Sequence, residues 1–326
     1  MAVLMRYLIF LLITGCGLDP FNEGPGGADN LPTLGAGPYA RFASDDATPA
    51  DEPFVFFDRN AELFDPTVIA GGPGLRVWMS REVPGAPDDD TQIYYGEVAS
   101  VHDVPAGTLS LALSADQAWE QGRVAAPTVV DLGGKHLVMF YEGGTTARAI
   151  GRADSTDDGA TWTKTATPVL SGAMQPSAAF ANDRFELYVT RPGSPAIWRA
   201  VGPQDGAFTF DPGPVLEPRP GVAKAFDADS LDSPCIVVHR ESTGRLHWAL
   251  FVVGYDATPD DAGSAHPAIG YAGSWDGTSW ERFGGVAAQL GAPAVGPAAL
   301  ITPAHGLLLY VDTKRGLRAI AAAHNP

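Results

Sequence analysis

Asp65-Pro66-Thr67-Val68-Ile69 is the first of five similar segments, in each of which a small or polar residue and a proline precede a short apolar run. The other four are Ala126-Pro127-Thr128-Val129-Val130, Gln175-Pro176-Ser177-Ala178-Ala179, Ser233-Pro234-Cys235-Ile236-Val237 and Gly296-Pro297-Ala298-Ala299-Leu300. A turn residue followed by such a run predicts a strand. The prolines are 61, 49, 58 and 63 residues apart. This spacing indicates an internal structural repeat.

Each repeat continues with two further runs of strand length. The second run is rich in aromatic and β-branched residues and spans residues 75–79, 136–141, 185–189, 246–251 and 307–311. The third run spans residues 93–96, 149–153, 196–200, 268–272 and 317–321. A fourth strand is expected in the first four repeats. Four short antiparallel strands per repeat predict the blades of a β-propeller.

The fifth repeat stops after its third strand. The apolar run Phe54–Phe57 precedes the first repeat, and we expect it to supply the missing outer strand and so to close the ring. The sequence therefore predicts an all-β fold over residues 53–326. This fold is a five-bladed β-propeller of four-stranded antiparallel blades, closed by an N-terminal strand. The 38 glycines and 28 prolines fit such a fold, because they interrupt helices, and a helical turn is expected only near residues 115–121.

Residues 1–15 have the features of a secretory signal peptide. Arg6 precedes the apolar run Tyr7–Ile13, which is shorter than the roughly 20 residues of a membrane-spanning helix. The segment Ile13-Thr14-Gly15-Cys16 resembles the lipobox of bacterial lipoproteins. That resemblance implies that Cys16 carries the lipid and anchors the mature chain in the bacterial cell envelope. Gly17 in place of an aspartate after Cys16 favours the outer membrane.

Residues 16–52 combine the lipidated cysteine with a stretch rich in Gly, Pro, Ala and Asp. Such a composition without apolar periodicity predicts a flexible tether, with local order near Tyr39 to Phe42. After modification of Cys16 only Cys235 remains, so no intramolecular disulfide is expected.

The charge excludes one class of partner. With 21 Lys and Arg against 38 Asp and Glu, the formal net charge is −17. We therefore expect no nucleic acid partner, and membrane contact only through the lipid anchor. The seven histidines lack metal-binding spacing, and no nucleophile elbow or phosphate-binding glycine loop is present. The sequence thus predicts neither a metal site nor a cofactor.

Ser155-Thr156-Asp157-Asp158-Gly159-Ala160-Thr161-Trp162 matches the Asp-box pattern Ser-x-Asp-x-Gly-x-Thr-Trp. The Ser and Asp side chains can accept backbone hydrogen bonds within the turn, and the glycine can adopt positive φ. Ser274–Trp280 is a shortened variant. We expect both to be structural turns between the third and fourth strands of their blades, since such a turn uses its polar groups internally.

The order of these motifs resembles the five-bladed glycosidases of the arabinanase, xylosidase and levanase type. The resemblance rests on the opening Asp65-Pro66, on the run from Ala149 to Trp162 and on the following Pro168-Val169-Leu170. It implies three channel-facing carboxylates on the first strands of blades one to three. Asp65 occupies the position of the base or nucleophile, whereas Ala126 and Gln175 stand where an orienting Asp and an acid Glu are expected.

Other polar residues near strand ends could complete a site, because the mouth of a propeller channel is built there. Glu142 and Asp232 are candidates for a relocated acid beside Asp65. Gln175 is a candidate sugar-binding residue, although an amide cannot donate a proton as an acid. The remaining candidates for a polar binding pocket are Asp58, Arg59, Asp229 and Arg240.

Three functional hypotheses follow. The first is a surface-anchored lipoprotein whose channel mouth binds a carbohydrate or an envelope protein partner without the standard hydrolase residues. The second is an active glycoside hydrolase that uses Asp65 with Glu142 or Asp232 as the acid. The third is a structural envelope protein. Whether the chain is an enzyme stays open, and Ala126 and Gln175 at two of the expected acid positions favour the non-catalytic hypothesis, since glycosidic cleavage needs a pair of carboxyl groups.

Overall fold

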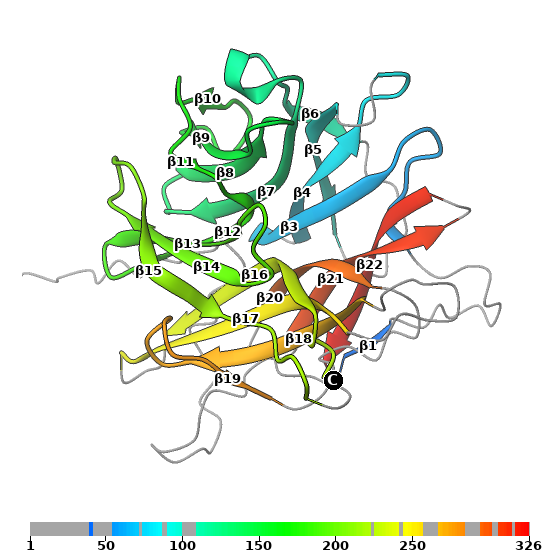
Figure 1. Cartoon of the computed structure of the whole chain (residues 1–326). Helices are drawn as coiled ribbons and strands as arrows, with labels where there is room; N and C mark the ends of the chain where they lie inside the picture. Colours follow the sequence, from blue (N-terminus) through cyan, green and yellow to red (C-terminus); the bar gives the residue numbers. More distant parts are fainter. Residues whose placement is uncertain are drawn as a thin grey trace, which may run out of the picture.

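The computed structural model describes residues 39–41, 54–71, 74–86, 90–99, 109–222, 225–240, 244–256, 267–283, 294–301, 306–314 and 317–325. They form five antiparallel sheets of four or five strands, arranged as the blades of a propeller (Figure 1). The predicted fold class is therefore confirmed. The predictions for residues 1–38, including the lipidation of Cys16, lie outside the described residues. No helix in the described part of the chain is long and apolar enough to cross a membrane.

Blades 1 to 4 each consist of strands that follow one another along the chain. Blade 1 contains β3 (Leu63–Gly71), β4 (Gly74–Glu82), β5 (Thr91–Val98) and β6 (Ser110–Leu113). Blade 2 contains β7 (Val124–Asp131), β8 (Leu137–Gly143), β9 (Ala149–Ser155) and, along its outer edge, β10 (Thr163–Lys164) and β11 (Leu170–Ser171). Blade 3 contains β12 (Met174–Ala181), β13 (Arg184–Thr190), β14 (Ile197–Gly202) and β15 (Thr209–Leu216). Blade 4 contains β16 (Ser230–Arg240), β17 (Leu246–Tyr255), β18 (Pro267–Ser274) and β19 (Glu281–Arg282).

Blade 5 combines strands from both ends of the described chain. Its inner strands are β20 (Val295–Ile301), β21 (Gly306–Lys314) and β22 (Leu317–Asn325). Both β2 (Phe54–Phe56) and β1 (Ala40–Arg41) pair with β22 as its outer edge. Closure by the run at Phe54 is therefore confirmed. Val55 and Phe56 are each 1% exposed. Tyr39 is also 1% exposed and lies where local order was expected within the predicted tether. A 3-10 helix, Ala118–Glu120, lies within the predicted helical stretch.

Each of the five innermost strands contains a β-bulge at the residue that precedes the repeated proline. All five residues have positive φ: Asp65 (46°), Ala126 (46°), Gln175 (49°), Ser233 (45°) and Gly296 (57°). This conformation costs an L residue roughly 1–2 kcal/mol, so the surrounding structure must hold four of the five in place. Together with their prolines, the five residues line a narrow space of about 30 Å³ where the blades meet.

A repeated hydrogen bond joins neighbouring innermost strands. In blades 1 to 4, the side chain of the residue after the repeated proline accepts a hydrogen bond from a backbone N–H of the next blade. The four donor and acceptor pairs are Val129 N to Thr67 Oγ1 (3.4 Å), Ala178 N to Thr128 Oγ1 (3.1 Å), Ile236 N to Ser177 Oγ (2.9 Å) and Ala299 N to Cys235 Sγ (3.3 Å). The equivalent residue in blade 5, Ala298, has no side-chain acceptor. The chain-closing junction between blades 5 and 1 therefore lacks this bond, and apolar packing and the ion pairs of Arg318 with Glu62 and Glu82 hold it instead.

The apolar core lies between blades rather than at one centre. Each of the five buried clusters takes its strand residues from two neighbouring blades. The cluster at the closing junction contains Val55 and Phe56 from β2 together with Leu300 and Leu309 of blade 5 and Val77 of blade 1. Blade-to-blade burial of this kind explains why the aromatic and β-branched runs recur once per repeat.

Candidate functional site

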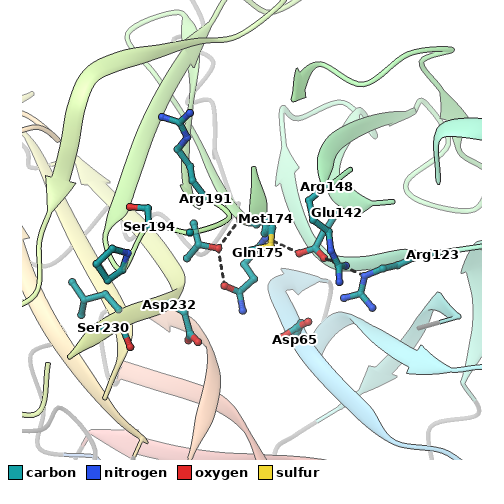
Figure 2. Close-up of a pocket in the computed structure, with 14 residues that line it drawn as sticks. Asp65, Arg123, Glu142, Arg148, Met174, Gln175, Arg191, Ser194, Ser230 and Asp232 are labelled. Atoms are coloured by element: carbon teal, nitrogen blue, oxygen red, sulfur yellow. Dashed lines mark hydrogen bonds and ion pairs between the residues drawn. The ribbon is translucent and has the colours of Figure 1, made fainter. Parts of the chain in front are cut away.

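A cavity of about 580 Å³ opens near the meeting point of the blades. It is wide enough for a small organic ligand, because such sites usually measure about 300–1,000 Å³. Its wall is strongly polar and includes three acidic and three basic side chains (Figure 2). The lining residues are Asp65, Arg123, Glu142, Arg148, Met174, Gln175, Thr190, Arg191, Gly193, Ser194, Pro195, Ser230, Leu231 and Asp232.

The structure brings together the three carboxylates that the sequence singled out as candidate catalytic groups. Asp65 comes from the bulge of β3, Glu142 from the end of β8 and Asp232 from the start of β16. They thus come from blades 1, 2 and 4, and all three line the same cavity. Sequence reasoning identified them because residues at the ends of inner strands reach the channel mouth.

Asp65 is held in an environment that favours its neutral form. Burial raises the pKa of this carboxyl to about 7, and the negative charges of Glu142 and Asp232 act in the same direction. Arg123 and Arg318 oppose the increase. Asp65 therefore carries a proton in a substantial fraction of molecules at neutral pH. Such a group can donate a proton at neutral pH, where an aspartate with an unshifted pKa is already ionised.

Glu142 is the opposite case, a carboxylate with charged hydrogen-bond donors. Its side chain is buried, and its Oε1 accepts hydrogen bonds from Arg123 Nε (3.1 Å) and Arg148 Nη1 (2.6 Å). Its Oε2 accepts a hydrogen bond from the backbone N–H of Gln175 (2.9 Å). Because both oxygens are occupied by strong donors, Glu142 fits an orienting role better than that of a proton donor.

Asp232 lies across the cavity from the Glu142 group (Figure 2). Its Oδ2 accepts a hydrogen bond from the hydroxyl of Tyr255 (3.0 Å). Its Oδ1 is buried and has no hydrogen-bond partner among the described residues. Burial raises the pKa of Asp232, while hydrogen bonds from Ser233 and Tyr255 partly offset this effect. A buried oxygen without a hydrogen-bond partner adds to the cost of ionising this carboxyl group.

Gln175, which stands where the resemblance implied a glutamate, uses its amide mainly to hold the neighbouring blade in place. Its Oε1 accepts hydrogen bonds from Thr190 Oγ1 (2.9 Å) and the Ser233 N–H (3.3 Å). Its Nε2 donates to Ser233 Oγ (3.1 Å). The amide thus connects blades 3 and 4 and fixes the floor of the cavity next to Asp232.

The structure does not bring the other four predicted residues into this cavity. Asp58 forms an ion pair with Arg81 (2.7 Å), and Arg59 is exposed outside the cavity. Asp229 is exposed and accepts a hydrogen bond from Ser230 Oγ (3.2 Å) beside the cavity. Arg240 ends the 11-residue strand β16, which begins at the cavity. At about 3.3 Å per residue, Arg240 therefore lies more than 20 Å from Asp232.

Sequence reasoning missed the arginines. Arg123 immediately precedes β7 and Arg191 immediately follows β13, whereas Arg148 immediately precedes β9. The rule that identified Glu142, a polar residue at the end of an inner strand, applies equally to Arg123 and Arg191. Within the described residues, no cluster of three or more His, Cys, Asp or Glu side chains could hold a metal ion.

The Asp-box turns take no part in the cavity, as expected from the sequence. In the first, Ser155 Oγ accepts a hydrogen bond from the Gly159 N–H (2.8 Å), and Asp157 accepts one from the Thr161 N–H (2.9 Å). Hydrogen bonds from Thr161 and Ser155 lower the pKa of Asp157 to about 2. The turn lies between β9 and β10, so the prediction of a structural turn between the third and fourth strands is confirmed.

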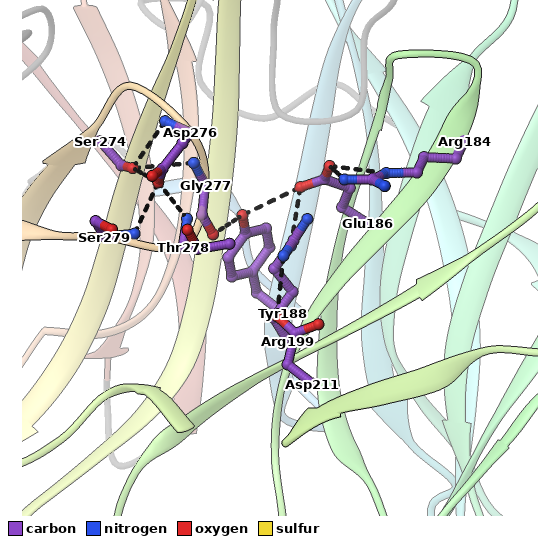
Figure 3. A network of polar contacts seen from close by, with 10 residues as sticks. All are labelled: Arg184, Glu186, Tyr188, Arg199, Asp211, Ser274, Asp276, Gly277, Thr278 and Ser279. Atoms are coloured by element: carbon purple, nitrogen blue, oxygen red, sulfur yellow. Dashed lines mark hydrogen bonds and ion pairs between the residues drawn. The ribbon is translucent and has the colours of Figure 1, made fainter. Parts of the chain in front are cut away.

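The second Asp-box attaches blade 4 to blade 3 (Figure 3). Ser274 Oγ and Asp276 Oδ1 accept hydrogen bonds from backbone N–H groups of the turn. The carbonyl of Gly277 accepts a hydrogen bond from Tyr188 Oη (2.8 Å) on β13. Beside it, the buried Glu186 is paired with Arg199 (3.1 Å). This network stabilises a blade junction away from the cavity.

Comparison with known proteins finds similarity in structure but not in sequence. No family model and no curated protein matches the chain. A solved structure from work on the GH130 family of mannoside phosphorylases and β-1,2-mannoside hydrolases superposes with a TM-score of 0.64 and 13% identity, covering 94% of this chain and 97% of that one. The α-L-arabinofuranosidase of Podospora anserina in complex with cellotriose superposes with a TM-score of 0.59 and 14% identity, covering 91% of this chain and 98% of that one.

A glycosyl hydrolase from Bacteroides ovatus superposes with a TM-score of 0.61 and 12% identity, covering 88% of this chain and 94% of that one.

At these identities the similarity establishes the fold. The chain is a five-bladed propeller structurally similar to glycoside hydrolases, in agreement with the resemblance seen in the sequence. What those proteins bind is a property of those proteins, and the chemistry of this cavity has to be argued from its own residues.

The raised pKa of Asp65 predicts a particular dependence of stability on pH. A carboxyl whose pKa is higher in the folded state stabilises the fold below its unfolded value near 4, and this contribution is lost as pH rises through about 7. Asp65→Asn cannot ionise. We therefore expect Asp65→Asn and the parent to have similar melting temperatures at pH 4, and the variant to melt higher at pH 8.

The matched control is Asp229→Asn, because Asp229 is an exposed aspartate beside the cavity. Its melting temperature should equal that of the parent at both pH values. Thermal denaturation between pH 4 and 8 measures the effect. Parallel melting curves for the parent and Asp65→Asn over this range would contradict the protonated state of Asp65.

Proposed function

We propose that the protein binds carbohydrate in the cavity that Asp65, Glu142 and Asp232 share. The observation that carries this proposal is the density of hydrogen-bonding groups on the cavity wall, where only Met174, Gly193, Pro195 and Leu231 lack a polar side chain. A sugar presents many hydroxyl groups, each of which donates and accepts hydrogen bonds, so it matches a surface with both carboxylates and guanidinium groups. The fold supports the proposal, since structurally similar proteins include one in complex with cellotriose.

A blocking variant tests this proposal. Ser230 lines the cavity at the start of β16, and Arg240 is exposed at the other end of the same strand. We expect Ser230→Trp to abolish binding to the glycans that the parent protein retains on a glycan array, because the indole fills the cavity. Arg240→Trp, with the same added side chain, should bind like the parent. Equal binding by both variants, or no glycan bound by the parent, would refute the proposal.

A second candidate function, cleavage of a glycosidic bond, is favoured by the state of Asp65 beside Asp232. Cleavage needs one carboxyl group to protonate the leaving oxygen and another to activate water or attack the sugar. The pKa of Asp65 is raised to about 7, and the negative charge of Asp232 contributes to this increase. A protonated Asp65 would then supply the acid, and an ionised Asp232 the base. Glu142 and its arginines would orient the sugar.

We expect Asp65→Asn and Asp232→Asn each to reduce turnover of the best substrate by at least about 10²-fold and to lower glycan affinity much less, since general acid–base catalysis contributes about 10²–10⁴-fold. Aryl arabinosides, xylosides and mannosides and short fructans are the substrates to screen. Arg240→Gln is the control and should turn over like the parent. Glycan binding without turnover by the parent would contradict the catalytic proposal and leave the binding proposal standing.

We further propose that Cys16 carries a lipid that holds the propeller on the outer membrane of a bacterial envelope. The support is the order of a basic residue, a short apolar run and Thr14-Gly15-Cys16 in the sequence. Several acyl chains hold a soluble domain on a membrane where one chain binds only marginally. Palmitate labelling of the parent and loss of the label in Cys16→Ser is the expected result, and equal labelling of both would contradict it.

A further inference from the structure

The cavity carries more positive charge than an acidic protein leads one to expect. The chain has a net charge of −17, yet three arginines line this cavity. Two of them, Arg123 and Arg148, contact the single carboxylate of Glu142. Two guanidinium groups thus face the single carboxylate of Glu142, and Arg123 also interacts electrostatically with Asp65, whose pKa is raised to about 7. Arg148 is also 22% exposed and has further N–H donors to offer.

Arg191 adds a third positive charge on the blade 3 side. Its guanidinium lies 4.5 Å from the ring centre of Trp198 and 4.4 Å from that of Phe210. No carboxylate among the described residues forms an ion pair with it, whereas ion pairs between an arginine and an Asp or Glu occur in every blade. Two aromatic rings fix the plane of the guanidinium and leave the N–H groups at its edge to bind an anion.

The loop that carries Arg191 is tied down on both sides. The Ser194 N–H donates to the Arg191 carbonyl (3.0 Å), which closes a turn. Trp198 Nε1 donates to Ser194 Oγ (2.9 Å), and the Leu231 N–H of blade 4 donates to the Pro195 carbonyl (2.8 Å). Ser194 uses its oxygen as the acceptor in the Trp198 bond, so its hydroxyl proton is still able to point into the cavity. A donor pair on a rigid loop loses little entropy on binding.

The charges are also separated within the cavity. In Figure 2 the guanidinium of Arg191 lies in the upper part of the view, and the carboxyl groups of Asp65 and Asp232 lie below the centre. A ligand that spans the cavity would therefore meet the Arg191 guanidinium at one end and the two aspartates at the other. A neutral glycan offers only hydroxyl groups to the cationic end, whereas a sugar with a carboxylate offers an acceptor of opposite charge, which forms stronger hydrogen bonds with a guanidinium group.

We propose that the glycan bound in this cavity is acidic, and that Arg191, assisted by Ser194, binds the carboxylate of a uronic acid residue. The inference rests on the proposed carbohydrate-binding function and names its ligand class. Arg148, on the opposite wall, contributes to the favourable potential while it orients Glu142. The aspartates are left to contact the neighbouring sugar hydroxyls or the glycosidic oxygen.

The test compares each acidic glycan with its own neutral counterpart. Oligosaccharides that contain galacturonate, glucuronate, mannuronate or guluronate are titrated calorimetrically beside the same oligosaccharides after reduction of the carboxyl groups to alcohols. We expect the parent to bind at least one uronate about 10-fold or more tightly than its reduced form, because a hydrogen bond to a charged group is worth about a factor of ten or more.

Three variants assign the preference to Arg191. Arg191→Gln should lower uronate affinity about 10- to 100-fold and leave affinity for the reduced glycan within about threefold of the parent. Arg191→Lys should retain part of the preference, since it keeps the charge but loses the planar fork. Arg240→Gln, which removes an exposed arginine far from the cavity, should behave like the parent. The melting temperature of each variant shows that the fold is intact.

The outcomes separate this inference from the function on which it rests. Equal binding of uronates and reduced glycans would overturn the acidic-sugar assignment and leave carbohydrate binding standing. The assignment is also overturned if Arg191→Gln keeps the full preference, or if inorganic phosphate alone binds through Arg191 while no uronate is preferred. If the parent binds none of the uronates and none of their reduced forms, both proposals are overturned.

Discussion

The bulge before each repeated proline is the constraint on which the rest of the structure depends. It holds a residue at positive φ on every innermost strand and turns it toward the meeting point of the blades. The backbone N–H that each bulge exposes needs an acceptor, and a side chain of the preceding blade supplies it at three consecutive junctions. The pairs are Ala126 N to Ser80 Oγ (2.8 Å), Gln175 N to Glu142 Oε2 (2.9 Å) and Ser233 N to Gln175 Oε1 (3.3 Å).

Glu142 and Gln175 therefore belong both to the ring and to the cavity. Each satisfies a backbone donor of the next blade, and each lines the proposed binding site. Loss of either acceptor would leave a buried N–H unpaired, which costs roughly 1–3 kcal/mol. The geometry of the site is consequently as rigid as the junctions between blades 2, 3 and 4. A preorganised polar site of this kind favours selective binding.

Two carboxyl groups of the cavity avoid the cost of an unpaired charge in different ways. Glu142 is surrounded by two guanidinium groups and an amide N–H. Asp65 instead keeps its proton until the pH approaches its pKa of about 7. Burying an ionised carboxylate without partners is expensive, so either solution is expected on physical grounds. Their coexistence in one cavity gives it an orienting anion and a proton donor at neutral pH.

Much of the fold could be predicted from the sequence, because a repeated strand pattern with turn residues leaves few architectures. The closing strand followed from the incomplete fifth repeat, and the Asp-box turns followed from their own hydrogen-bonding groups.

The site was predicted in part. Asp65, Glu142 and Asp232 were identified from their positions at the channel ends of inner strands, as the structure places them. The other four candidates do not line this cavity. For Arg240 the reason is that sequence position does not show which end of a strand faces the cavity. Asp232 and Arg240 lie near opposite ends of β16, and only the former lines the cavity. The strand-end rule would also have indicated Arg123 and Arg191, whereas the role of Arg148 depends on its contact with Glu142, which the spacing along the chain does not reveal.

The most direct test is the titration of Asp65 itself. Carbon-13 NMR of carboxyl-labelled aspartate follows each side chain from pH 3 to pH 9, and the spectrum of Asp65→Asn assigns the resonance. We predict one aspartate resonance with a midpoint near pH 7 that is missing from the variant, as the pKa of about 7 requires. Titration of every aspartate resonance below about pH 5, where ordinary aspartates titrate, would contradict the proton-donating state of the cavity.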